Sequence, residues 1–159
     1  MKAVTLKQLK DELTCKSAKE LQELCLHLSK FKKENKELLT YLLFEQQHED
    51  YYIETIKEEI DMLFKGINTN SYYYIRKGVR KILSLTKKYI RYSKKKETET
   101  ELLLYFCKKM QEFTPSIKNS IQLQNIFNTQ VRMIQKAIEK LHEDLQYDFT
   151  LELNNLIDA

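Results

Sequence analysis

The stretch YYYIRKGVRKILSLTKKYIRYSKK, residues 72–95, decides the fold class of this chain. Its apolar side chains, among them Ile75, Val79, Ile82 and Ile90, recur at the three- and four-residue spacing of an amphipathic helix. The stretch therefore predicts a long helix with one apolar face, which must be covered by other elements.

Composition extends this prediction to the whole chain. Of 159 residues, 42% are hydrophobic, which is enough for one domain over residues 1–159 with a buried core. The chain has 2 Gly and 1 Pro, whereas β-sandwiches, β-barrels and doubly wound α/β folds need these residues at their many turns. The same scarcity excludes the Gly-rich phosphate loops of nucleotide enzymes. We therefore expect an all-α fold of six to seven helices.

Local signals place the boundaries of these helices. A polar segment at residues 46–50 either continues a helix or breaks it. The other expected boundaries are two capping boxes (Thr5 with Gln8, Ser17 with Glu20), a cap at Asn35, a helix end at Gly66, a loop at 68–71, a cap at Thr98 with Glu101, and a stop at Thr114-Pro115.

An internal match indicates a duplicated helical hairpin. Residues 28–43 are identical to residues 92–107 at seven of sixteen positions, and both contain Glu-Leu-Leu-x-Tyr. We extend this repeat to about residues 17–47 and 81–111. Such a repeat favours an α-solenoid-like array or a pseudo-symmetric bundle. It resembles HEAT and armadillo arrays in architecture only.

The last predicted helix carries a narrow apolar seam. We expect this seam to pack on a neighbouring helix, either within a monomer or across a homodimer through residues 127–145. Its members follow a 4-3-4-3-4 spacing: Phe127, Val131, Ile134, Ile138, Leu141 and Leu145.

Charge is concentrated on the helix at 71–96. Residues 62–96 hold eleven Lys or Arg and no Asp or Glu, whereas the rest of the chain has 16 basic and 23 acidic residues. On a helical projection the basic side chains fall within an arc of about 140°, opposite the apolar side. Tyr73 points into the same arc. We call this set the basic face: Arg76, Lys77, Arg80, Lys81, Lys87, Lys88, Arg91, Lys94 and Lys95, with Tyr73 as its aromatic member.

Two interpretations of the basic face remain open at this point. Acidic residues at 45–61 and 139–158 can pair with it inside the fold and leave little external field. Alternatively the face is free, and it binds either an acidic protein surface or the phosphates of DNA or RNA. We expect a non-enzymatic interaction module that binds an acidic protein, with nucleic-acid binding as the alternative.

A third interpretation comes from two Glu-x-x-His pairs, Glu45 with His48 and Glu139 with His142. This spacing occurs in di-iron carboxylate bundles. However, Glu139 lies about 120° from the centre of the apolar seam on a helical projection. We therefore assign no catalytic residue, metal ligand or cofactor.

The remaining features concern the compartment. Residues 1–13 contain no apolar run typical of a signal peptide, so we expect none, and no apolar run of the chain is long enough to span a bilayer. The three cysteines, Cys15, Cys25 and Cys107, lack the spacing of a zinc site and are odd in number. We expect a cytoplasmic protein without a transmembrane segment.

Overall fold

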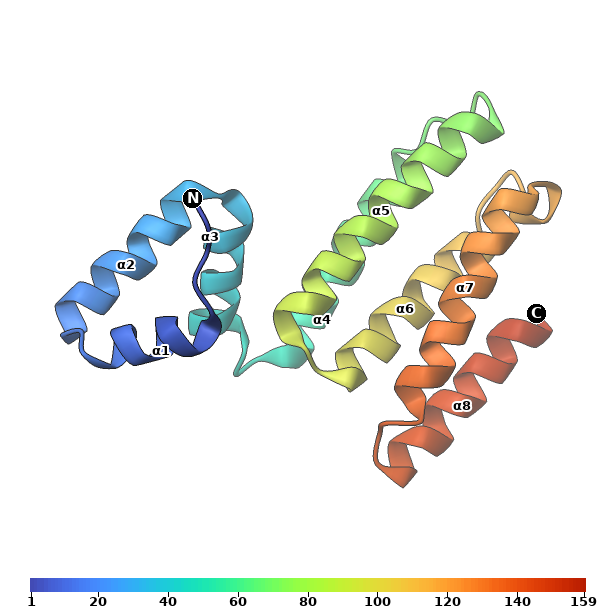
Figure 1. Cartoon of the computed structure of the whole chain (residues 1–159). Helices are drawn as coiled ribbons and strands as arrows, with labels where there is room; N and C mark the ends of the chain where they lie inside the picture. The colour runs from blue at the N-terminus through green and yellow to red at the C-terminus, as the bar shows by residue number, and fades with distance from the viewer. The chain divides into compact units, whose positions relative to one another are not determined.

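The computed structural model describes all residues from Met1 to Ala159 and contains eight α-helices and no β-strand (Figure 1). The all-α prediction is confirmed, but the expected six to seven helices are too few. Contacts divide the chain into two compact units, Met1–Phe44 and Glu45–Ala159. The single domain and the duplicated hairpin stay predictions. None of the helices is both long enough and apolar enough to cross a membrane.

Unit 1 consists of short helices with little core. Both predicted capping boxes are confirmed, because Thr5 and Ser17 each accept a hydrogen bond from the backbone three residues later. No side chain in its three α-helices is buried. These helices are α1 (Leu6–Thr14), α2 (Ala18–Phe31) and α3 (Lys33–Thr40), followed by the π-helix η1 (Tyr41–Glu45).

Unit 2 is built around a central helix. The helix α6 contacts α4, α5, α7 and α8 (Figure 1), and eight of its side chains are buried. Its apolar run Leu102–Leu104 is buried throughout, which requires neighbouring helices on more than one side. The helices of this unit are α4 (Glu49–Lys65), α5 (Tyr72–Ser93), α6 (Lys96–Gln111), α7 (Ile121–Ile138) and α8 (Glu143–Asp158), with a 3-10 turn, η2, at Ile117–Asn119.

The core of unit 2 follows the predicted apolar spacing. Ile60 of α4, Ile75 and Val79 of α5, and Phe106 of α6 have no exposed surface. The Phe106 ring lies 5.8 Å from the ring of Phe64, in a tilted arrangement that adds a specific aromatic contact to the burial. Removal of these side chains from water is the main favourable contribution to the fold of this unit.

Two predicted helix caps are wrong by three residues. Asn35 does not cap α3; the helix begins at Lys33, and the Asn35 amide donates to the Leu28 carbonyl at 2.8 Å. Thr98 does not cap α6, which begins at Lys96; its hydroxyl instead donates to the Glu49 carboxylate at 2.6 Å. Both helices begin after a lysine without a side-chain cap, so the sequence carries no capping signal there.

The expected last helix over residues 127–145 is also wrong. The chain ends α7 at Ile138 and begins α8 at Glu143. Ile134 and Ile138 of the seam are buried in unit 2, where α7 packs mainly on α6. The part of the apolar seam that lies on α7 is therefore buried within the chain.

The cysteines give a first testable prediction. Burial raises the pKa of the Cys107 thiol to about 12, whereas Cys15 and Cys25 are exposed. Since the thiolate is the reactive form, a maleimide reagent is expected to label Cys15 and Cys25 rapidly and Cys107 only after unfolding. Mass spectrometry of labelled peptides checks this. Fast labelling of Cys107 in the native protein would contradict the burial of α6.

Candidate functional site

The helix α5 presents the basic face and is fixed at both ends. Ser71 accepts a hydrogen bond from the Tyr74 amide at its start, and the last helical residue is Ser93. Lys94 then adopts a left-handed backbone conformation with φ of 59°. Lys94 and Lys95 therefore lie beyond the helix rather than in the helical arc where the sequence placed them.

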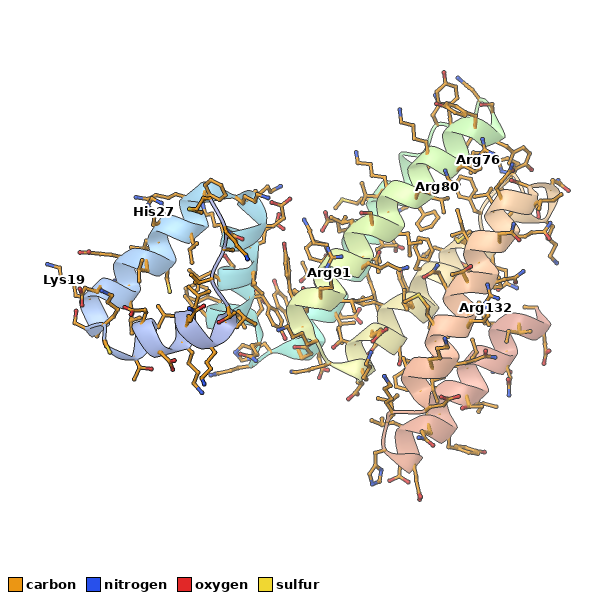
Figure 2. All side chains as sticks on the ribbon, viewed as in Figure 1. Lys19, His27, Arg76, Arg80, Arg91 and Arg132 are labelled. Carbon is orange, nitrogen blue, oxygen red and sulfur yellow. The ribbon has the colours of Figure 1, made fainter.

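Most cations of the basic face reach solvent. Lys77, Arg80, Lys81 and Arg91 are exposed, while Arg76 is half-buried. Figure 2 shows the three arginines following one another along α5. Six members of the face form no ion pair within the chain: Arg76, Lys77, Arg80, Lys81, Arg91 and Lys94.

The other members have partners. Lys95 forms an ion pair with Glu49 at 3.0 Å. The Lys87 ammonium lies 3.5 Å from the Met133 sulfur, and that of Lys88 lies 5.0 Å from the centre of the Tyr89 ring.

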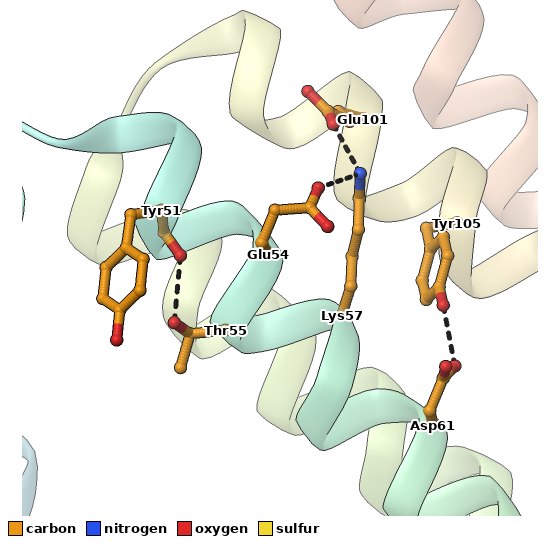
Figure 3. A network of polar contacts seen from close by, with 7 residues as sticks. All are labelled: Tyr51, Glu54, Thr55, Lys57, Asp61, Glu101 and Tyr105. Atoms are coloured by element: carbon orange, nitrogen blue, oxygen red, sulfur yellow. Dashed lines mark hydrogen bonds and ion pairs between the residues drawn. The ribbon is translucent and has the colours of Figure 1, made fainter.

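Two acidic residues of α4, Glu54 and Asp61, pair with lysines outside the basic face, whereas Glu59 accepts a hydrogen bond from the Tyr89 hydroxyl of α5 at 2.9 Å. Two carboxylates, Glu54 and Glu101, bind Lys57 at 2.8 and 2.6 Å (Figure 3). Asp61 pairs with Lys109 at 2.9 Å and accepts a hydrogen bond from the Tyr105 hydroxyl at 2.8 Å. Internal compensation, one of the two interpretations left open by the sequence, thus reaches Lys95 but not the six cations without an ion pair.

The pKa values of this acidic network follow from its contacts. Burial lowers the pKa of Lys57, but its hydrogen bonds to Glu101 and Glu54 more than offset this, so the net pKa is raised. Burial raises the pKa of Asp61, but the hydrogen bonds from Lys109 and Tyr105 outweigh it, so the net pKa is lowered. Both shifts favour the charged forms and keep the network closed at neutral pH.

Acidification is therefore expected to remove the contribution of Asp61 to stability. A carboxylate whose pKa is lowered in the folded state stabilises the fold at any pH above its ordinary pKa of about 3.9. This stabilisation is lost as the pH falls through the lowered pKa of the folded state. Urea unfolding of the wild type and Asp61→Asn, from about pH 6 to about pH 3, measures this contribution. The wild type is expected to lose more stability than the variant. Parallel pH curves would show that Asp61 makes no such contribution.

The helix α7 extends the cationic surface. The Lys87–Met133 contact joins α5 to α7, and the Tyr72 hydroxyl donates to the Ser116 carbonyl at 2.9 Å near their other ends. Residues 113–138 contain no Asp or Glu. Thr129 and Lys136, four before and three after Met133, share the side of α7 that meets α5. The apolar spacing predicted the helix but not its part in the cationic surface, although its lack of acidic residues was a usable signal.

Tyr73 occupies the position expected of it. Its side chain is 60% exposed, its ring packs edge-on against Tyr74 at 5.3 Å, and the Arg76 guanidinium lies 6.0 Å from its centre. A cation held near a ring face adds to the attraction between this corner of the surface and a planar or anionic group.

A cleft between α4 and α5 adjoins the basic face. Its volume is about 530 Å³, and Lys77 and Lys81 line it. Gly78 allows the close approach of Ile67 that shapes the cleft, because a Cβ at Gly78 would lie 2.9 Å from the Ile67 side chain. The cleft was not predicted. Its lining is mostly apolar: Met62, Leu63, Gly66, Ile67, Asn68, Tyr74, Lys77, Gly78, Lys81 and Ile82.

The two Glu-x-x-His pairs do not lie within helices. Glu45 ends η1 and His48 precedes α4, while Glu139 and His142 stand in the turn between α7 and α8. The one-turn spacing that would aim both side chains at a single ion is therefore lost. No group of three or more His, Cys, Asp or Glu side chains gathers in a metal-binding arrangement.

Comparisons with known proteins add no assignment. No protein-family model matches the chain, and no curated protein and no solved structure is significantly similar to it. The candidate site therefore rests on the geometry described above.

Proposed function

We propose that unit 2 is a non-enzymatic binding module that takes an acidic segment of a partner protein on the basic face of α5. The observation that carries this proposal is the set of six cations without an intramolecular ion pair, beside helix α4, whose Glu54 and Asp61 pair with lysines outside the basic face. Arg76, Arg80 and Arg91 offer bidentate geometry to carboxylates.

The cleft between α4 and α5 supports a protein ligand. An apolar side chain placed there would bring flanking carboxylates within reach of Lys77 and Lys81, which line the cleft. A buried apolar anchor surrounded by charged contacts is the usual energetic pattern of protein interfaces.

A second candidate, nucleic-acid binding, is favoured by the acid-free surface of α7. Lys136 is exposed on the side of α7 that meets α5, and Arg132, labelled in Figure 2, is exposed on the same helix. A row of cations along α5, with a further cation on α7 and exposed Tyr73, also suits a phosphate backbone and an unpaired base.

Fluorescence anisotropy tests both candidates on the full chain. The protein probe is a synthetic peptide with one central Leu flanked by Glu, and the nucleic-acid probes are single- and double-stranded oligonucleotides. Salt is varied from about 50 to about 200 mM, because phosphate contacts weaken steeply over this range. We expect the peptide to bind and to lose affinity when its Leu becomes Ser. Oligonucleotide binding that is tighter than peptide binding and falls steeply with salt would show that the function is nucleic-acid binding. No binding of any probe would refute both candidates.

We also propose that the hairpins α2–α3 and α5–α6 are related copies. The identities at residues 28–43 and 92–107 place the same Glu-Leu-Leu-x-Tyr segment on α3 with η1 and on α6. Each hairpin joins its helices with a very short connection, at Lys32 in unit 1 and at residues 94–95 in unit 2. This correspondence allows a comparison of which surfaces of each hairpin are buried by neighbouring helices.

A further inference from the structure

Unit 1 carries a groove that the basic face of α5 does not explain. Its volume is about 640 Å³, and α2, α3 and η1 line it. Leu26 is 49% exposed, Leu43 64% and Phe44 68%, while Leu39 is half-buried between them. Several large apolar side chains gathered in one groove without cover indicate an interaction site.

The rim of this groove is basic. Lys30, Lys33 and Lys36 line it, and no acidic residue does. Lys33 alone has an ion pair, with Glu37 at 3.5 Å, and its own side chain is 85% exposed. Such an exposed pair contributes little and leaves the lysine available. The groove therefore combines an apolar floor with positive charge at its edge.

The second hairpin indicates what kind of element fits the groove. Under the 64-residue shift, the α3 and η1 positions 36, 39, 40 and 43 correspond to Thr100, Leu103, Leu104 and Cys107 of α6. All four are buried in unit 2, where α7 and α8 pack on α6. In unit 2 this surface is therefore covered by helices, whereas in unit 1 it is open.

We propose that the groove of unit 1 is a docking site for an acidic amphipathic helix of a partner protein. The helix would lay an apolar stripe over Leu26, Leu39 and Leu43 and place carboxylates beside Lys30, Lys33 and Lys36. This mode of recognition uses apolar residues at positions i, i+3, i+4 and i+7. The charge of the rim selects an acidic helix over a basic one.

The other side of the same hairpin provides a matched control. A smaller groove of about 230 Å³ lies there, lined by Leu42 among others and by no charged residue. Leu42 and Leu43 are neighbours in η1, and both are exposed. The pair Leu43→Asp and Leu42→Asp therefore introduces the same change into two different grooves.

The test uses the full chain carrying Arg76→Glu, Arg80→Glu and Arg91→Glu, so that binding at α5 is disabled. The probe is a synthetic helix of about 20 residues, long enough to form in water, with a Leu stripe and Glu flanks. A second peptide has Lys in place of Glu. We expect Leu43→Asp to weaken binding of the acidic peptide at least about tenfold, since it removes a buried leucine contact. Leu42→Asp is expected to change it less than about twofold.

Variants at exposed lysines test the proposal separately, because they are expected to leave the fold intact. The double variant Lys30→Glu with Lys36→Glu is expected to weaken binding of the acidic peptide and to strengthen binding of the Lys peptide. The control, Lys16→Glu with Lys19→Glu, changes two other exposed lysines of unit 1 and is expected to alter neither affinity. Unchanged binding in the Lys30/Lys36 variant would overturn the proposal. A second result would also overturn it: no binding of the acidic peptide, together with a concentration-dependent dimer that Leu43→Asp abolishes. The groove would then bind a second copy of the chain.

Discussion

Replacement of Arg76, Arg80 and Arg91 by glutamate is expected to weaken binding of the Leu-centred acidic peptide at least about tenfold. Each exposed pair contributes about 0.2–1 kcal/mol, and each reversal adds a repulsion of similar size. The three positions together then change the binding free energy by about 1–6 kcal/mol, which is at least about one decade in affinity. Fluorescence anisotropy at low salt measures the loss.

The matched control is a reversal of three exposed cations in unit 1, Lys7, Lys10 and Lys19. Both variants change the net charge of the chain by the same amount, so a non-specific electrostatic effect would weaken peptide binding equally in both. We expect the control to retain the wild-type affinity within about threefold. Equal losses in both variants would show that α5 is not the contact surface.

The Phe106→Ala variant is expected to lose about 3–5 kcal/mol of the free energy of unfolding. Phe106 has no exposed surface and lies on α6, which all other helices of unit 2 contact. A loss of this size is a large fraction of the about 5–15 kcal/mol that stabilises a typical domain. Urea denaturation followed by circular dichroism measures it.

The corresponding control is Phe31→Ala. The Phe31 side chain is 73% exposed, so its removal is expected to change stability by less than about 0.5 kcal/mol. If Phe106→Ala were as stable as Phe31→Ala, α6 would not be the centre of the core.

Local chemistry predicted the starts of α1 and α2, where side chains form capping boxes. Thr5 and Ser17 form reciprocal bonds within a single turn, so neighbouring residues alone determine them. The helices α3 and α6 begin after Lys32 and Lys95 without a side-chain cap. Their starts depend on the packing of the hairpins, which no local signal reports.

The break between α7 and α8 was missed for a different reason. Leu141 and Leu145 continue the phase of Ile134 and Ile138, so the apolar spacing passes through the turn without a visible interruption. His142 caps α8 by accepting a bond from the Asp144 amide at 3.4 Å, and histidine is not among the preferred caps.

The candidate site was predictable in its charge but not in its pairing. The periodicity placed Arg76, Arg80 and Arg91 on the outer side of α5, because helix geometry alone sets that position. The directions of Glu54 and Asp61 depend on where Lys57 and Lys109 lie after packing. Whether α4 neutralises α5 is therefore a tertiary property.

Lysine footprinting tests most directly the claim that α5 is the contact surface. The full chain is acetylated with and without the Leu-centred acidic peptide, and modified lysines are quantified by mass spectrometry. The account predicts protection of Lys77 and Lys81, which line the cleft beside the basic face. Exposed lysines elsewhere in unit 2, such as Lys108 and Lys118, are expected to react unchanged. Protection confined to Lys30, Lys33 and Lys36, or uniform across the chain, would contradict the account.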